Sequence, residues 1–148
     1  MPEHLKLVLV DDDPAHARLF ERTLHRAGIR NRIVHVLDGA TALELLFAIA
    51  GSTDSGAPEP LLIVLDINMP GVDGYQVLRR IKTDDNTRHI PVIVLTTTQE
   101  QQEVTRCRAL GCDAVLFKPL DLSKFLQATE QLNLTLERAD DVTSGKRS

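Results

Sequence analysis

The sequence predicts one doubly wound α/β domain in which five strands alternate with five helices. Five short apolar runs alternate with helical patterns, and this alternation is typical of a parallel sheet with helices between its strands. Three of the runs are almost continuously apolar, as strands covered on both faces need to be. Right-handed crossovers then place helices on both faces of the sheet. The predicted strands are Leu5–Val10, Ile33–Val36, Leu61–Leu65, Pro91–Leu95 and Ala114–Phe117.

The predicted helices have recognisable starts and ends. Asp13 followed by Pro14 is typical of an N-cap and a first helical residue, and Gly28 is expected to end that helix. A polar segment rich in Gly, Ser and Pro, residues 51–60, follows the second helix. Gly111 is expected to close the fourth helix. The helices are expected over residues 14–27, 40–50, 74–82 and 99–110, and from 121 onward.

Composition and charge exclude several other classes of protein. Hydrophobic residues make up 43% and charged residues 26%, as in ordinary globular domains. The net charge of -4 argues against a broad surface for nucleic acid. No apolar run approaches the roughly 20 residues of a membrane helix, and the N-terminus lacks a signal-peptide pattern, so we expect a cytoplasmic protein. Neither the two cysteines, Cys107 and Cys112, nor the five histidines have metal-ligand spacing.

Polar residues follow four of the predicted strands at the point where each strand ends. Ligands of open parallel sheets bind at these carboxyl ends. Carboxylates brought together there repel one another, and a divalent cation such as Mg2+, which prefers oxygen ligands, would neutralise them. The residues are Asp11, Asp12 and Asp13 after the first strand, Asp66 after the third, Thr96 after the fourth and Lys118 after the fifth.

Each of these residues also has a structural explanation when it is taken alone. Acidic residues in loops are commonly solvated, and Asp13 by itself is a helix cap. Four strands that all end in suitable groups instead indicate phosphoryl chemistry. Asp66 would be the attacking carboxylate, and Lys118 and Thr96 would bind the phosphoryl oxygens. The bond between Lys118 and Pro119 is a candidate for the cis form.

Four segments together resemble the response-regulator receiver family. The spacing matches as well, notably the 22 positions from Thr96 to Lys118. The resemblance covers residues 5–134 and implies a flavodoxin-like three-layer sandwich with strand order 2-1-3-4-5. We expect residues 135–148 to be a polar, partly disordered extension. The matching segments are Val8–Pro14, Leu65–Gly74, Val94–Thr97 and Phe117–Pro119.

The resemblance implies a role for each polar residue. Asp66 matches the phosphoacceptor, Thr96 the switch hydroxyl and Lys118 the phosphoryl-binding lysine. The donor would be a phosphohistidine on a sensor histidine kinase, and the chain would catalyse only its own phosphorylation and dephosphorylation. The implied Mg2+ ligands are the side chains of Asp12 and Asp66, Asp11 through water, and the backbone carbonyl of Asn68.

Further features are similar to small response regulators that pair with bacterial phytochromes. These are the acceptor loop Asn68–Met69–Pro70, the long loop after the second helix and the C-terminal extension. The similarity implies a stand-alone receiver that signals by protein binding or phosphorelay, with a bacteriophytochrome as a possible kinase. It also implies a homodimer, for which the fifth helix and the strand that contains Val115 form a plausible surface.

One departure from the family leaves alternatives open. Val115 stands three positions before Lys118, where the family usually has Tyr or Phe, so a phosphorylation-independent interaction module is one alternative. A Mg2+-dependent phosphatase with an Asp nucleophile is another, but such enzymes carry a second Asp two positions later. Here that position is Asn68, which cannot act as a general acid. A nucleotide-binding protein is disfavoured because no Gly-rich loop follows the first strand.

Overall fold

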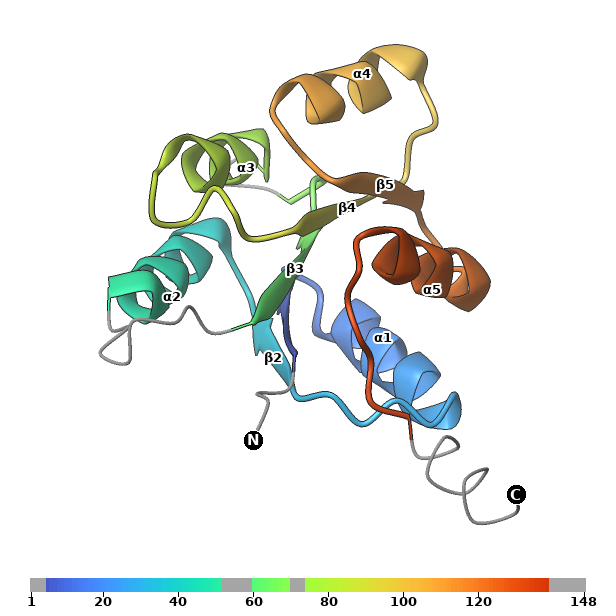
Figure 1. Ribbon diagram of the computed structural model, residues 1–148. Helices are drawn as coiled ribbons and strands as arrows, with labels where there is room; N and C mark the ends of the chain where they lie inside the picture. Colours follow the sequence, from blue (N-terminus) through green and yellow to red (C-terminus); the bar gives the residue numbers. More distant parts are fainter. Residues whose placement is uncertain (1–4, 52–59, 70–73, 139–148) are drawn as a thin grey trace.

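The computed structural model describes residues 5–51, 60–69 and 74–138 of the chain. Five parallel strands form one sheet in the order β2-β1-β3-β4-β5, and five helices connect and follow them, so the predicted fold class and strand order are confirmed (Figure 1). The strands are β1 (Lys6–Val10), β2 (Ile33–Val36), β3 (Leu61–Asp66), β4 (Val92–Thr96) and β5 (Ala114–Phe117). The helices are α1 (Pro14–Arg26), α2 (Gly39–Gly51), α3 (Gly74–Thr83), α4 (Gln101–Ala109) and α5 (Leu122–Gln131).

Most of these bounds lie within one or two residues of the expected ones. The fourth strand begins at Val92 rather than Pro91, because proline has no N–H to give to a ladder. Asp13 caps α1 by accepting from the N–H of Ala15 at 2.9 Å, and Gly28 follows that helix with a φ of 83°. Most of the loop at 51–60 and the end of the acceptor loop at 70–73 lie outside the described residues.

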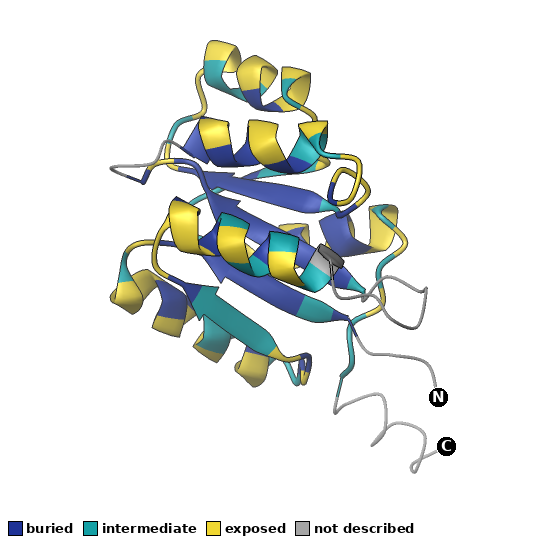
Figure 2. Cartoon of the chain, turned by 90° about the vertical axis from the view of Figure 1, so that its left-hand side faces the viewer, coloured by how far each residue is buried: buried dark blue, intermediate teal, exposed yellow. Residues whose placement is uncertain are grey.

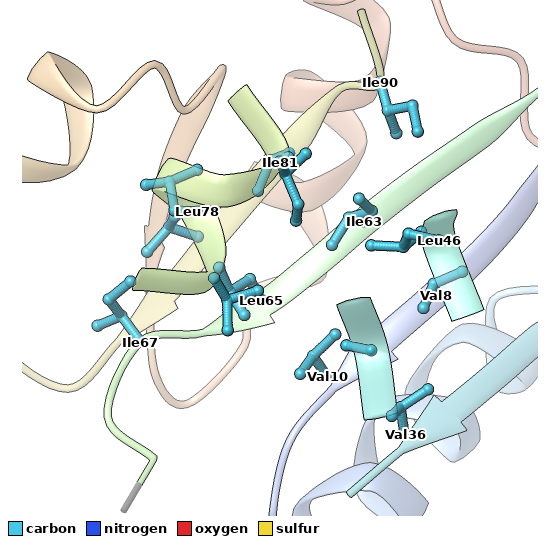
Figure 3. Close-up of a cluster of buried hydrophobic side chains, with 14 of the residues drawn as sticks. Val8, Val10, Val36, Leu46, Ile63, Leu65, Ile67, Leu78, Ile81 and Ile90 are labelled. Carbon is cyan, nitrogen blue, oxygen red and sulfur yellow. The ribbon is translucent and has the colours of Figure 1, made fainter. Parts of the chain in front are cut away.

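The sheet separates two hydrophobic cores, and its central strands are buried on both faces (Figure 2). One core joins the sheet to α2, α3 and α4, and it includes Ile63 and Leu65 of β3 (Figure 3). The other joins the opposite face to α1 and α5 and includes Leu62 and Val64 of the same strand. Alternate side chains of β3 therefore enter different cores, which explains why its sequence is apolar throughout.

Close approach of two backbone segments fixes the start of α3. A Cβ atom on Gly74 would lie 2.8 Å from the Cα of Ile67 and 2.9 Å from its carbonyl oxygen. These distances are too short for any side chain, so position 74 requires glycine while this contact is kept. The contact holds the first turn of α3 against the segment that directly follows β3.

The segment after α5 returns to the N-terminal ends of the strands. Arg138 forms an antiparallel bridge with Ile29, and Leu134 and Leu136 pack on the core beneath α1 and α5. The buried side chain of Asn31 donates to the carbonyl of Leu5 at 2.8 Å and accepts from the N–H of Glu137 at 2.6 Å. Residues 135–138 of the expected extension are thus attached to the domain, and residues 139–148 lie outside the described residues. No helix in the described ranges is long and apolar enough to cross a membrane.

Candidate functional site

The polar residues predicted from the sequence meet at the C-terminal edge of the sheet. Asp11 directly follows β1 and Asp66 ends β3, and these two strands are paired neighbours. One carboxylate oxygen from each of Asp11, Asp12 and Asp66 lies within 4.8 Å of the others. Asp11 and Asp66 are each 2% exposed, whereas Asp12 faces solvent. The three carboxylates therefore form one crevice that is open on the side of Asp12.

Lys118 enters this crevice from the end of β5. Its Nζ lies 3.0 Å from Oδ2 of Asp66 and 3.5 Å from Oδ2 of Asp11, and its side chain is 15% exposed. The bond from Lys118 to Pro119 is cis, as the sequence suggested. The lysine brings one positive charge to three carboxylates, so the crevice keeps an excess of negative charge.

The pKa of the Asp11 carboxyl is raised, and burial is the main cause. The nearby charge of Asp66 adds to the increase. The N–H of Asp13 and the ammonium of Lys118 oppose the shift without cancelling it. A raised pKa means that the charged form of a carboxyl is not fully compensated, and a bound cation would provide that compensation.

The two buried carboxylates are each fixed by a backbone N–H. Asp13 donates to Oδ1 of Asp11, and Asn68 donates to Oδ1 of Asp66, both at 2.9 Å. The other oxygen of each carboxylate faces Lys118. Three carboxylates with converging oxygens and too little positive charge fit Mg2+, because Mg2+ is a hard cation that takes oxygen ligands.

Asn68 connects the end of β3 to the end of β4. Its Oδ1 accepts from the hydroxyl of Thr96 at 3.2 Å and from the N–H of Thr97 at 2.9 Å. Thr96 is 1% exposed, and its hydroxyl oxygen accepts from the N–H of Thr98 at 3.2 Å. The Thr96 hydroxyl thus contacts Asn68 in this structure and has to leave that contact before it can donate elsewhere.

Two histidines at the site were missed by the sequence reasoning. His16, on α1, has Nδ1 3.5 Å from Nζ of Lys118 and 3.8 Å from Oδ2 of Asp11. His35, on β2, has Nε2 2.7 Å from the carbonyl oxygen of Asp11. Neither belongs to a spacing motif, and only the pairing of β1 with β2 shows that His35 lies beside Asp11.

A parallel sheet in this order with an acidic crevice and a lysine at its C-terminal edge defines the receiver class of signalling domains. The chain belongs to the response regulator receiver domain family, whose model matches residues 7–130. It is a receiver domain of two-component signalling and is related to the response regulators of phytochromes.

Individual relatives support this assignment. Response regulator Rcp1 of Synechocystis sp. is 34% identical over 127 residues, which cover 84% of this chain and 85% of Rcp1. The bacteriophytochrome response regulator AtBRR superposes with a TM-score of 0.76 at 33% identity, over 90% of this chain and 96% of AtBRR. The phosphorylated cyanobacterial phytochrome response regulator RcpA superposes with a TM-score of 0.69 at 31% identity, over 90% of this chain and 98% of RcpA.

Proposed function

We propose that Asp66 accepts a phosphoryl group from a sensor histidine kinase, with Mg2+ bound beside it. The observation that carries this proposal is the convergence of three carboxylates against a single lysine. The relatives support it, because RcpA was solved phosphorylated and Rcp1 was solved with bound Mn2+. The proposed Mg2+ ligands are Asp12 and Asp66, Asp11 through water, and the backbone carbonyl of Asn68.

The proposed reaction is a displacement at phosphorus. A carboxylate oxygen of Asp66 attacks the phosphorus of an N-phosphoimidazole, the P–N bond breaks, and the leaving imidazole nitrogen takes a proton from solvent. Bound Mg2+ would neutralise charge on the phosphoryl oxygens. Lys118, which faces Oδ2 of Asp66, moves to a phosphoryl oxygen, and Thr96 exchanges its bond to Asn68 for one to the phosphoryl group.

Intact-protein mass after incubation with Mg2+ and acetyl phosphate tests the proposal. The wild type is expected to gain about 80 Da, the mass of one phosphoryl group. Asp66→Asn is expected to gain nothing, and EDTA is expected to abolish the gain. Asp85→Asn, an exposed carboxylate beyond α3, is the matched control and keeps the gain. A wild type that gains no mass from acetyl phosphate or from a phosphorylated histidine kinase would contradict the proposal.

The kinase we propose is a bacteriophytochrome, which phosphorylates this chain in the cytoplasm. The support comes from the similarity to AtBRR and RtBRR, both described as bacteriophytochrome response regulators. The receiver would then signal by a changed protein contact or by passing the phosphoryl group on. Transfer from a phosphorylated bacteriophytochrome is expected to be faster than transfer from an unrelated kinase, and equal rates would count against this pairing.

We also propose that the receiver forms a homodimer through β5 and α5. Strand β5 lies at the edge of the sheet, and Val115 within it is half-buried. Sedimentation with and without beryllofluoride, a phosphoryl mimic, tests this proposal. A monomer under both conditions would overturn it.

A phosphorylation-independent interaction module is the second candidate function. Val115 favours it, because the aromatic residue that the family usually has at this position is missing. Under this alternative, Asp66→Asn leaves partner binding and signalling unchanged. If phosphorylation is the switch, the same substitution abolishes the response of both to the phosphodonor.

A further inference from the structure

We propose that His35 is a positioning residue that holds the Asp12 carboxylate in place for Mg2+ by fixing the peptide that joins Asp11 to Asp12. This inference rests on the Mg2+ site proposed above. It assigns a task to a residue outside the acidic crevice, on the neighbouring edge strand β2.

The contact between His35 and Asp11 has a defined direction. Nε2 of His35 lies 2.7 Å from the carbonyl oxygen of Asp11. A carbonyl oxygen can only accept, so Nε2 of His35 must carry the hydrogen and donate it. The N–H of Asp11 donates in turn to the carbonyl of Val36 at 3.0 Å. Strand β2 therefore holds Asp11 through both of its backbone polar groups.

Asp12 needs such support more than the other two carboxylates do. Asp11 and Asp66 are buried, and each side chain is held by a backbone N–H and by Lys118. The Asp12 side chain is exposed and has no hydrogen bond or ion pair with any residue in the described ranges. Its place in the cluster therefore depends on the backbone that carries it.

That backbone begins with the peptide that His35 holds. The carbonyl of Asp11 and the N–H of Asp12 belong to one planar unit, so a bond to the carbonyl sets the orientation of the whole unit. This orientation directs the chain at Asp12, whose carboxylate oxygen lies within 4.8 Å of those of Asp11 and Asp66. Loss of the His35 donor would free the peptide to rotate and would move one of the three oxygens away from the cation.

The alternative role for the histidine is purely structural, because its ring could merely pack at the edge of the sheet. Two substitutions separate the donor from the ring. His35→Phe keeps a planar ring and removes the donor, whereas His35→Gln keeps an N–H donor of similar reach and removes the ring. If His35 positions Asp12, the Phe variant is the impaired one. If the ring matters through its packing, the Gln variant is the one that binds Mg2+ more weakly.

The measurement is the Mg2+ dissociation constant by titration calorimetry, without any phosphodonor. His35→Phe is expected to bind Mg2+ about tenfold more weakly, since loss of an outer partner of a metal ligand costs 10- to 100-fold in affinity. His35→Gln is expected to stay within about twofold of wild type. Val34→Ala, on the same strand, is the control: it removes packing from the first core, so it lowers stability and leaves the dissociation constant unchanged.

Phosphorylation by acetyl phosphate gives a second readout. The Mg2+ concentration for half-maximal rate is expected to rise about tenfold in His35→Phe. The rate at saturating Mg2+ is expected to match wild type, because Asp66, Lys118 and Thr96 are untouched. If the Phe variant failed to fold, His35→Leu would take its place as a smaller side chain without a donor.

Two results would overturn the inference. One is a wild-type dissociation constant in the variant without a donor, and the other is weaker Mg2+ binding in the Gln variant than in the Phe variant. The proposed function survives both, because the wild type would still bind Mg2+ and accept the phosphoryl group. Absence of Mg2+ binding in the wild type would overturn the proposed function and this inference with it.

Discussion

Two lysines at opposite ends of the sheet have similar burial and different surroundings. The side chain of Lys82 is 11% exposed and that of Lys118 is 15% exposed, and each Nζ has three polar neighbours. Lys82 donates to the carbonyls of Arg88 and Ile90 at 3.1 and 2.6 Å, and it pairs with Oδ2 of Asp113 at 3.0 Å. Lys118 instead faces two carboxylates and the imidazole of His16.

The difference lies in whether the charges balance. At the N-terminal ends of the strands, one ammonium meets one carboxylate, and Oδ2 of that carboxylate also accepts from the N–H of Val92 at 2.8 Å. At the C-terminal ends, one ammonium faces two carboxylates of a three-carboxylate cluster. A balanced pair with satisfied hydrogen bonds holds elements together, whereas an unbalanced cluster has room for a further positive charge. Substitution of each lysine therefore has a different expected outcome.

The largest effect is expected for Lys82→Met. The substitution removes three interactions and leaves the Asp113 carboxylate without its cation, so the free energy of unfolding is expected to fall by about 3 kcal/mol. Urea denaturation measures the change, and the deficit should be the same in EDTA and in Mg2+. If Mg2+ reduced this loss of unfolding free energy, the comparison would fail, because the N-terminal end of the sheet would then also respond to the cation.

A smaller, Mg2+-dependent effect is expected for Lys118→Met. Without the lysine the carboxylates repel one another uncompensated, and the free energy of unfolding in EDTA is expected to fall by about 2 kcal/mol. Saturating Mg2+ supplies positive charge and stabilises the folded state through binding, so the deficit should shrink to under about 1 kcal/mol. The same urea titrations with and without Mg2+ measure this, and a deficit unchanged by Mg2+ would contradict it.

The smallest effect is expected for Asp11→Asn and has the opposite sign. The folded-state pKa of Asp11 is raised, so ionisation of this group opposes folding above that pKa, and the opposition disappears as the pH falls through it. At pH 7 in EDTA, the variant is therefore expected to be more stable than wild type, by less than the change expected for Lys118→Met. Its advantage should decrease on acidification, as followed by urea denaturation at several pH values. A variant less stable than wild type at pH 7 would show that the cluster is already compensated.

The sequence predicted the elements because their signals are local. Continuous apolar runs marked β3 and β4, and Asp13 with Pro14 marked the start of α1. The strand order depended on the family resemblance, since no local pattern states which strands are neighbours. The positions of Asp66 and Lys118 at strand ends predicted roles in phosphoryl chemistry, and the resemblance implied the same roles. The structure brings these residues together, and their roles remain the proposals given above.

The interactions that the sequence could not reveal join residues far apart in the chain. Lys82 and Asp113 are separated by 31 positions, and His35 and Asp11 by 24. No spacing rule connects such pairs, because their distance depends on crossovers and strand register. His35 could be recognised as a partner of Asp11 only once the register of β2 against β1 and the contact itself were known. Long-range polar contacts of this kind can therefore be predicted only after the strand order and register are known.

The side chain of Asn31, which bonds to both Leu5 and Glu137, has a consequence for domain architecture. One side chain thus joins the first and last parts of the described fold, so the chain enters and leaves the domain at nearly the same point. That point lies at the end of the sheet opposite the acidic crevice. Such a module can be inserted into a longer polypeptide through two short linkers. The rest of that polypeptide would then lie on the side of the domain away from any phosphodonor.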